Sequence, residues 1–519
     1  MNLRTSLVAL VLVTACGSTV QLQGTGSQPG DGLSTTAAGT QDPGLSAGGT
    51  AGGTTSGGTS TSGSTSSSGT STTGATAPLP QGTSTGGGTS TTGGPATAGT
   101  IPLTGKGWDA KHVYIGIPTA DDFNAAVKGL GGNFDNGSVQ GDANAVAADI
   151  NRHGGLFGRQ VVPVYHDTST VSLQSNPAQV AQSMCAYFTQ DRPVVAVLNG
   201  APQLDGVPAF HTCLEKAGVS LLTFTNTDYS DSDYQRLGPH LWSGFSLSTD
   251  TLVPSFVDAL QRQGFFAGWS TLTGAPSKDP TKVGLLLPDS PQGHHAAGLF
   301  TSILKKHGIP IASSFFYDPA GSGSASSSEV LQFQSAKVTH VLDLPPVAAE
   351  VYLFQGTAEN QHYRPRYGIT SFNLPLSMEE NAAFAPPGQQ IGTMGIGWQP
   401  LNDTNASHDP GPVAGTKRCT AALSKGGQTF TTTRRRAALI GAGFCDAIYV
   451  LRDAMLAGHG LGAAALLKGM PLLGTSFPTA ATFGSALSVT NHGVPGSYRD
   501  LQYDKGCTCF VYSGPKRAF

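Results

Sequence analysis

Polar side chains that could hold a small molecule gather in four loops of the 519-residue chain, at 118–122, 199–205, 224–229 and 289–294. Each loop follows a short apolar run. Hydroxyl, amide and phenol groups form hydrogen bonds with a polar ligand while staying neutral. The candidates for ligand binding among them include Asn199, Gln203, Tyr229 and Gln292. Asp121, Asp122 and Asp205 in the same loops are further candidates, although such residues, like Tyr229, are more often solvated loop residues.

Sequence signatures of catalysis are missing. The chain has no GxSxG elbow, no HExxH pair and no GxxxxGK[ST] loop. The GHGLG run at 458–462 follows a helical pattern, whereas a dinucleotide loop follows a strand. His294 and His295 are neighbours at a helix start, so their side chains point about 100° apart and cannot readily chelate one ion alone. We therefore predict binding without catalysis, cofactor or metal.

The elements that must position these loops alternate regularly between apolar runs and amphipathic helices. Runs at 112–117, 161–164, 194–198 and 220–224 are short and rich in Val and Leu, as in strands buried on both faces of a parallel sheet. Between them lie three helical stripes. The stripes contain Val139, Ala143, Val146, Ala147 and Ile150, then Val180, Met184 and Tyr187, then Val207, Phe210, Leu214 and Ala217. This alternation predicts a doubly wound α/β lobe, with ligands outside the carboxyl ends of its strands.

The pattern restarts after residue 282 and predicts a second lobe of the same kind. Its expected strands cover 283–287, 309–316, 340–344 and 367–371, with helices at 253–263, around 300–304, at 330–336 and at 348–357. A further strand is expected at 392–398 and a long apolar helix at 437–457. The end of the chain alternates short runs with turn residues, which favours antiparallel strands.

The first 105 residues have a different composition. Arg4 precedes the apolar run 7–13, which is too short to span a bilayer, and Val13-Thr14-Ala15-Cys16 resembles the lipobox of bacterial lipoproteins. The resemblance predicts a signal peptide at 1–16 and a lipid on Cys16; the alternative is an ordinary secretory signal with a chance cysteine. Residues 17–105 are nearly all Gly, Ser, Thr and Ala, and predict a disordered tether.

Charge and cysteine content limit the partners of the remaining chain. Without Arg4, Asp31 and Asp42 it has 28 Lys and Arg against 30 Asp and Glu, a formal net charge of −2, which gives no electrostatic case for nucleic acid. Six cysteines remain besides Cys16, and fifteen pairings are open to them. Nearness in the expected topology favours disulfides that join Cys185 to Cys213, Cys419 to Cys445, and Cys507 to Cys509. Metal binding by these cysteines is the competing interpretation, but no CxxC spacing or nearby His pair supports it.

The segment NAVAADINRHGGLFGRQVVPVYHD resembles the "ELAVEEINAAGGVLGRKIELVVAD" segment of type I periplasmic binding proteins, in the leucine/isoleucine/valine-binding branch of ABC transporter substrate-binding proteins. The segments VVAVLNG, EKAGVSLLTFTNT, KVGLLLPDSPQG, LQFQSAKVTHVLDL and FPTAATFG match in order and spacing, so that the resemblance covers roughly 107–512. Independently of the family, Gly154 can end a helix in a left-handed conformation, and Gly155 and Gly158 permit a tight reversal.

The resemblance implies two lobes joined by three crossings, near 243–246, 371–375 and 493–497. The N-terminal lobe would comprise 107–245 plus 375–495, and the C-terminal lobe 246–374 plus 496–519. Thr227 matches a threonine that binds the ligand carboxylate, and Thr225 a position that contributes its carbonyl; both could instead cap the following turn. Gln292 stands where an aromatic residue is usual, and a Ser/Gly tract where the ammonium-binding carboxylate is expected.

The function implied is a lipid-anchored, extracytoplasmic solute-binding protein of an ABC importer. It would be a monomer that closes on a small polar, amino-acid-like ligand and docks on permease subunits at the cell membrane. A ligand-sensing receptor lipoprotein of the same fold and an anchored cell-surface enzyme remain the alternatives.

Overall fold

The computed structural model describes residues 101–125, 136–201, 204, 207–223, 227–237, 240–318, 325–344, 349–428 and 434–519. The predicted signal peptide, Cys16 and nearly all of the predicted tether lie outside these ranges. So do three of the loop residues singled out above, Gln203, Asp205 and Thr225.

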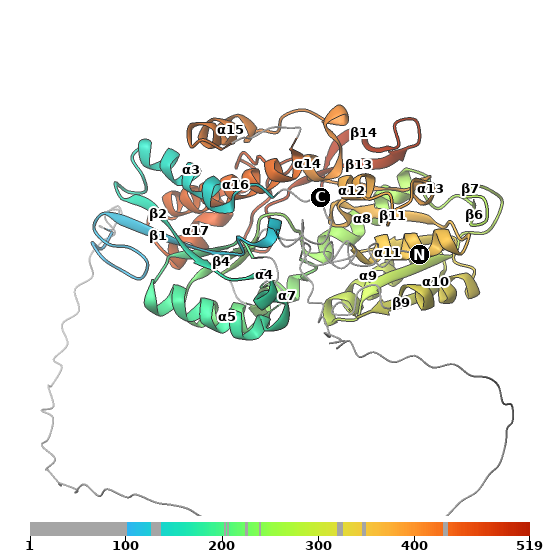
Figure 1. The fold of residues 1–519 in the computed structure, drawn as a ribbon, viewed down its shortest axis with the longest axis horizontal. Coiled ribbons are helices and arrows are strands. Elements are labelled where there is room, and N and C mark those ends of the chain that lie inside the picture. Colours follow the sequence, from blue (N-terminus) through green and yellow to red (C-terminus); the bar gives the residue numbers. More distant parts are fainter. Residues whose placement is uncertain are drawn as a thin grey trace, which may run out of the picture. The chain divides into compact units, whose positions relative to one another are not determined.

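The first sheet has five parallel strands in the order β2-β1-β3-β4-β5 (Figure 1). Its strands are β1 (His112–Thr119), β2 (Gln160–Asp167), β3 (Ala196–Asn199), β4 (Ser220–Thr223) and β5 (Leu241–Ser243). The strands β3 and β4 are buried along their whole length, because helices cover both faces. The four runs predicted as strands are therefore confirmed.

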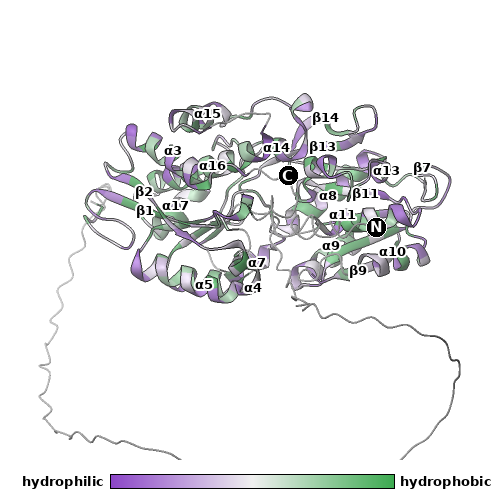
Figure 2. Ribbon diagram, viewed as in Figure 1, coloured by the Kyte–Doolittle hydropathy of each residue, from purple (hydrophilic) through white to green (hydrophobic). Residues whose placement is uncertain are grey.

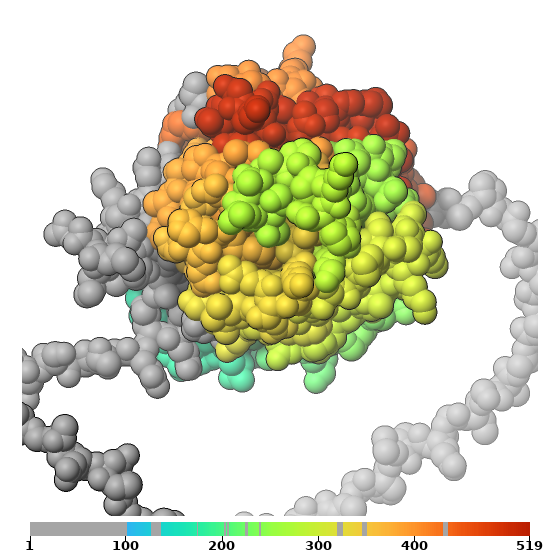
Figure 3. All heavy atoms as spheres, turned by 90° about the vertical axis from the view of Figure 1, so that its right-hand side faces the viewer, coloured from blue at the N-terminus to red at the C-terminus, as the bar shows by residue number. Residues whose placement is uncertain are grey.

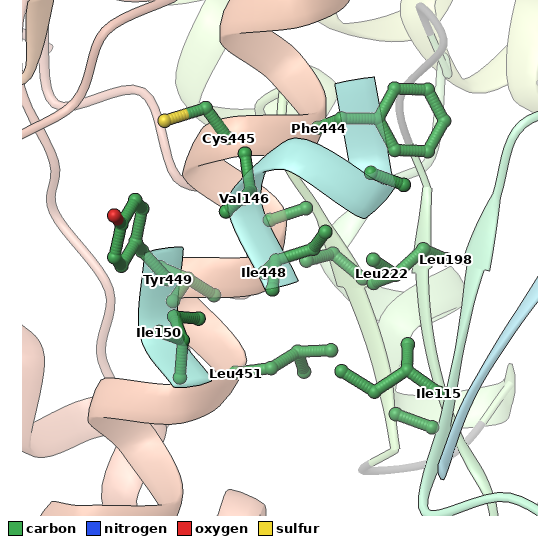
Figure 4. Close-up of a cluster of buried hydrophobic side chains, with 14 of the residues drawn as sticks. Ile115, Val146, Ile150, Leu198, Leu222, Phe444, Cys445, Ile448, Tyr449 and Leu451 are labelled. Carbon is green, nitrogen blue, oxygen red and sulfur yellow. The ribbon is translucent and has the colours of Figure 1, made fainter. Parts of the chain in front are cut away.

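Two groups of helices cover the first sheet. One face carries α3 (Val139–Arg152), α15 (Thr416–Lys425), α16 (Arg435–Ala457) and α17 (Ala463–Leu473), and the other carries α4 (Thr170–Ser175), α5 (Pro177–Ala186), the π turn η1 (Tyr187–Asp191), α6 (Pro208–Lys216) and α7 (Asp231–Leu237). In Figure 4, Ile448 and Leu451 of α16 point toward Leu222 and Ile115 of the sheet, and Val146 of α3 lies beside α16. The long apolar helix near the end of the chain thus completes the first core.

The second sheet has seven strands in the order β14-β13-β12-β11-β10-β8-β9. They are β8 (Val283–Pro288), β9 (Ile311–Tyr317), β10 (His340–Asp343), β11 (Arg366–Thr370), β12 (Met394–Gly397), β13 (Ser497–Asp504) and β14 (Cys509–Ala518). The five from β8 to β12 are parallel, and β13 and β14 add antiparallel, as predicted for the end of the chain.

Helices also cover both faces of the second sheet. One core includes α8 (Thr249–Arg262) and α9 (Pro291–Lys306), and the other includes α10 (Ser326–Ser335), α11 (Ala349–Asn360) and α12 (Pro375–Glu380). The remaining elements are β6 (Trp269–Ser270), β7 (Ala275–Pro276), η4 (Ser371–Asn373), α13 (Pro387–Gln390), α14 (Pro400–Asp403) and η5 (Ala406–His408). Figure 2 shows the hydrophobic residues concentrated in the strands and on the sheet-facing sides of the helices. Among the described residues, no helix combines the length and hydropathy of a membrane span.

The strand β12 corrects one boundary of the expected lobes. The range 375–495 was assigned to the N-terminal lobe, but β12 pairs with β11 and β13 of the second sheet. The physical reason is that Gly395 and Ile396 pair in parallel with Ile369 and Thr370 of β11. The chain is therefore still part of the second sheet at these residues. The division of the chain between lobes stays a proposal.

Three segments that run between the sheets are hydrogen-bonded to one another. The indole Nε1 of Trp398 donates to the carbonyl of Phe245 at 2.8 Å, and the Phe483 N–H donates to the carbonyl of Trp398 at 3.2 Å. The Val494 N–H donates to the carbonyl of Ser243 at 2.8 Å. Trp398 is fully buried, and the one polar atom of its side chain bonds to the backbone carbonyl of Phe245.

The Gly-Gly turn and the cysteine pairings are both confirmed. Gly154, Gly155 and Gly158 have φ of 96°, 69° and 76°, the left-handed region expected of them. Disulfides join Cys185 to Cys213, Cys419 to Cys445, and Cys507 to Cys509.

Candidate functional site

The carboxyl ends of β3 and β4 lie side by side, because Asn199 pairs with Thr223 in the parallel register. Asn199 is 1% exposed and its Oδ1 accepts a hydrogen bond from the Ala201 N–H at 3.1 Å. This contact closes the turn after β3, so at least one amide atom of Asn199 has a structural role. Thr223 is fully buried, and its hydroxyl has no hydrogen-bond partner among the described residues.

Thr227 follows β4 and presents a second such hydroxyl. Its N–H donates to the Ser246 Oγ at 2.7 Å, which ties it to the segment after β5. The side chain is 5% exposed, and in the described part of the chain nothing bonds to its Oγ1. A capping hydroxyl would accept a backbone N–H. Among the described residues, the Thr227 side chain therefore does not cap the turn.

A cavity of about 370 Å³ opens at the carboxyl ends of β1 and β3. Ala120 after β1 and Gly200 after β3 form part of its wall, and Ser138 and Gln140 at the start of α3 form another part. Asp121 also lines it, and the pKa of this carboxyl is raised by burial and by the nearby Asp167. The cavity thus lies where ligands bind in open parallel sheets, next to a helix N-terminus.

Asp122, the neighbouring candidate, has a structural role. Its Oδ1 accepts hydrogen bonds from the N–H of Thr170 at 2.8 Å and from the Thr170 hydroxyl at 2.6 Å. These contacts fix the start of α4 to the loop after β1.

Tyr229 packs within the helices of the first sheet. The phenol is 8% exposed and lies 3.2 Å from the Nε2 of His211, while its ring stacks edge-on against Tyr234 at 5.6 Å. Its neighbour Asp228 is half-buried, and burial raises the pKa of this carboxyl to about 6.

Gln292 links the two sheets. It lies in the first turn of α9, and its Nε2 donates to the Oδ1 of Asp233 in α7 at 3.1 Å. Burial opposes the ionisation of Asp233, but hydrogen bonds from Arg236, Ser230 and Gln292 outweigh it and lower the pKa of this carboxyl. Gln292 therefore contacts the opposite side of the expected cleft in this structure.

The adjacent histidines of α9 bond to different aspartates. The His294 Nε2 lies 2.9 Å from Asp289 Oδ1, and the His295 Nε2 lies 2.9 Å from Asp250 Oδ1. Their side chains diverge, as the helical geometry requires.

A cluster of buried acids at the carboxyl edge of the second sheet was not predicted. Asp343 ends β10, Glu350 lies in the first turn of α11, and Glu329 lies in α10; all three are fully buried. Burial, together with Glu350 and Asp343, raises the pKa of Glu329 to about 10. Burial likewise raises the pKa of Asp343 well above its usual range, although Asn373 donates to it at 2.5 Å.

Tyr317, the last residue of β9, faces the same acids. It is 1% exposed, and its hydroxyl lacks a hydrogen-bond partner among the residues that the structure describes. Burial and the charges of Asp343 and Glu350 raise its pKa. The sequence carries one signal for this cluster, since Asp343 and Glu350 interrupt apolar segments at a strand end and a helix start. Glu329 follows a serine run and has no such signal.

Neither protein-family models nor curated proteins match the sequence. Solved structures do match. A type 1 periplasmic binding protein from Bordetella pertussis Tohama I aligns with a TM-score of 0.53 at 12% identity, over 78% of this chain and 99% of that one. An ABC transporter substrate-binding protein from Desulfitobacterium hafniense in complex with Leu gives 0.52 at 14%, over 78% and 100%. A solute-binding protein of an ABC transporter from Rhodopseudomonas palustris HaA2 with p-hydroxybenzoic acid gives 0.53 at 11%, over 79% and 97%.

The chain therefore has the type I periplasmic binding protein fold, as the sequence resemblance predicted. The bound molecules named for these structures differ in chemistry, so the fold alone does not specify a ligand.

Proposed function

We propose that this protein is an extracytoplasmic solute-binding protein of an ABC importer, which binds a small polar ligand between two lobes. The observation that carries the proposal is the position of four buried polar atoms without hydrogen-bond partners in the described part of the chain. They are the hydroxyls of Thr223, Thr227 and Tyr317 and the Oδ1 of Asp343, and each lies at or just after the carboxyl end of a strand. A buried polar atom without a partner costs about 1–3 kcal/mol, which a ligand would recover on binding.

Both sheets contribute to this set, which favours a ligand held between them. Hydroxyls on the first sheet suit a carboxylate or another acceptor. The acids of the second sheet, which burial keeps protonated in the unliganded protein, would suit a cationic group by giving up a proton as it binds. An amino-acid-like zwitterion, a short peptide or an amine fits this division. Binding would shift an open–closed equilibrium by the difference in affinity between the two forms.

Titrating the purified complete chain with amino acids, short peptides, amides and polyamines tests the binding role. A ligand at 100 times its Kd adds about 2.7 kcal/mol to the free energy of unfolding, which thermal denaturation detects. Thr227→Val should weaken binding about 10-fold and leave the unliganded protein at least as stable, because the lost hydroxyl bonds to nothing within the described chain. Thr212→Val, on the exposed face of α6, is the matched control. Equal affinity in wild type and Thr227→Val would refute the assigned contact, and no binding across the panel would refute the function.

The membrane anchor is part of the same proposal. Lipidation of Cys16 would attach the protein to the extracytoplasmic face of the cell membrane, where a tether of residues 17–105 lets the binding domain reach permease subunits. Mass spectrometry of the mature N-terminus tests it: a diacylated Cys16 is expected, and Cys16→Ser should release the protein from membranes. A sensor would bind a signalling protein instead of a permease. Co-purification of permease subunits with the ligand-bound protein would therefore favour import over signalling.

A further inference from the structure

The turn between β13 and β14 holds two cysteines beside a histidine from elsewhere in the chain. Cys507 and Cys509 flank Thr508, and His408 of η5 is 101 residues away in sequence from Cys509. One ligand atom from each of the three lies within 4.8 Å of the others. Figure 3 shows β13 and β14, in red, at the surface of the molecule.

The distances fit a tetrahedral zinc ion when the disulfide is open. In such a site a sulfur and a nitrogen are about 3.5 Å apart and two sulfurs about 3.8 Å apart. The Cys509 Sγ lies 3.3 Å from the Nδ1 of His408 and 3.9 Å from its Nε2. The Cα atoms of the two cysteines are 5.2 Å apart, so rotation of the half-exposed Cys507 side chain suffices to separate the sulfurs.

Neighbouring groups hold His408 in place. Its Nδ1 lies 3.1 Å from the Oδ1 of Asn405, and the Nδ2 of Asn405 donates to the Oε2 of Glu379 at 3.1 Å. The other Glu379 oxygen accepts the N–H of Phe510, the residue after Cys509. This chain of bonds fixes the imidazole and Cys509 relative to each other. Because Asn405 engages Nδ1, the nitrogen left to bind the ion is Nε2, 3.9 Å from the Cys509 Sγ.

We propose that Cys507, Cys509 and His408 form a redox-gated site for a thiophilic divalent cation such as Zn²⁺. In the oxidised protein the two sulfurs are bonded to each other, as in this structure, and the site is closed. A dithiol reductant transfers two electrons and two protons to the disulfide and is itself oxidised to a disulfide. The two thiols then lose their protons as the ion binds both thiolates and the imidazole, and water takes the fourth position on the exposed side of Cys507.

This site is independent of the proposed solute site. Because Met394 at the start of β12 pairs with Gln502 near the end of β13, the turn lies at the amino edge of the parallel strands. The polar atoms assigned to the solute lie at the carboxyl edge. Failure of either proposal leaves the other intact.

The test uses the complete chain reduced with a phosphine and supplied with Zn²⁺. Alkylation followed by peptide mapping measures the protection of each cysteine in the wild type, and a chromophoric chelator measures the affinity. We expect Zn²⁺ to protect Cys507 and Cys509, and His408→Ala to weaken binding roughly 100-fold. His307→Ala, which removes an exposed imidazole, should bind as the wild type does.

The double variant Cys507→Ser/Cys509→Ser identifies zinc bound by the five other cysteines, Cys16 included. Two results would overturn the proposal. One is zinc uptake that is unchanged in this double variant. The other is equal alkylation of Cys507 and Cys509 in the wild type with and without Zn²⁺. Because the mapping is done on the wild type, it stays decisive if a variant fails to fold.

Discussion

Replacement of Glu329 by glutamine should make the protein more stable at neutral pH. The carboxyl is fully buried, and its pKa is raised from 4.5 to about 10. A carboxyl with a raised pKa in the folded state contributes stability that is fully present below the unfolded pKa and is lost as the pH rises toward the folded one. Between pH 4.5 and pH 7 the unfolded chain ionises at this position while the folded chain does not. At 1.36 kcal/mol per pH unit, this linkage lowers the free energy of unfolding by about 3 kcal/mol.

Glutamine has nearly the same shape and cannot ionise, so Glu329→Gln removes this loss. The free energy of unfolding of the variant relative to wild type should therefore rise by about 3 kcal/mol between pH 4.5 and pH 7. Urea denaturation followed by circular dichroism at both pH values measures it. The difference between the two pH values cancels any packing change caused by the amide. Glu215→Gln on α6 is the control for a lost charge alone. A relative stability that is the same at both pH values would refute the assignment of a neutral, buried carboxyl at 329.

Two further predictions concern backbone and cross-links. Gly155→Ala would place a Cβ 2.0 Å from the carbonyl oxygen of Arg159, and should lower the free energy of unfolding by about 2 kcal/mol or more. At Gly158 an added Cβ would meet no atom within 4 Å, so Gly158→Ala should cost only about 1 kcal/mol, because of the positive φ. Thermal denaturation of both variants checks this, and equal losses would show that the clash is relieved. Alanine at both Cys419 and Cys445 should lower the urea midpoint by the equivalent of about 3.5 kcal/mol, from a closed loop of 26 residues. A loss below 1 kcal/mol would contradict the loop-closure account.

The local elements could be predicted because their causes are local. Strands such as β3 and β4 lie in short runs rich in Val and Leu, a pattern that indicates burial on both faces of the sheet. The helices α3 and α6 carry apolar residues at helical spacing, which indicates burial of one face. The Gly-Gly turn follows from the steric freedom of glycine alone. The three disulfides followed once the order of elements was fixed.

The binding residues were harder to predict, because a side chain's role depends on what faces it. Thr227 was predicted as a contact or a cap, and only the structure shows that its hydroxyl caps nothing among the described residues. Asp122 looked like a free loop carboxylate until its bonds to Thr170 were seen.

By itself, the sequence determined the alternation of strands and helices and the two repeated windings, since hydrophobic burial and chain connectivity act on neighbouring residues. It favoured three cysteine pairs among fifteen pairings, and the structure decided them. Only the tertiary structure decided that β12 belongs to the second sheet, that Glu329 meets Glu350, and that His408 lies against Cys509. These contacts join residues far apart in the chain, and their energies arise from desolvation and from geometry that exists only after the sheets have formed.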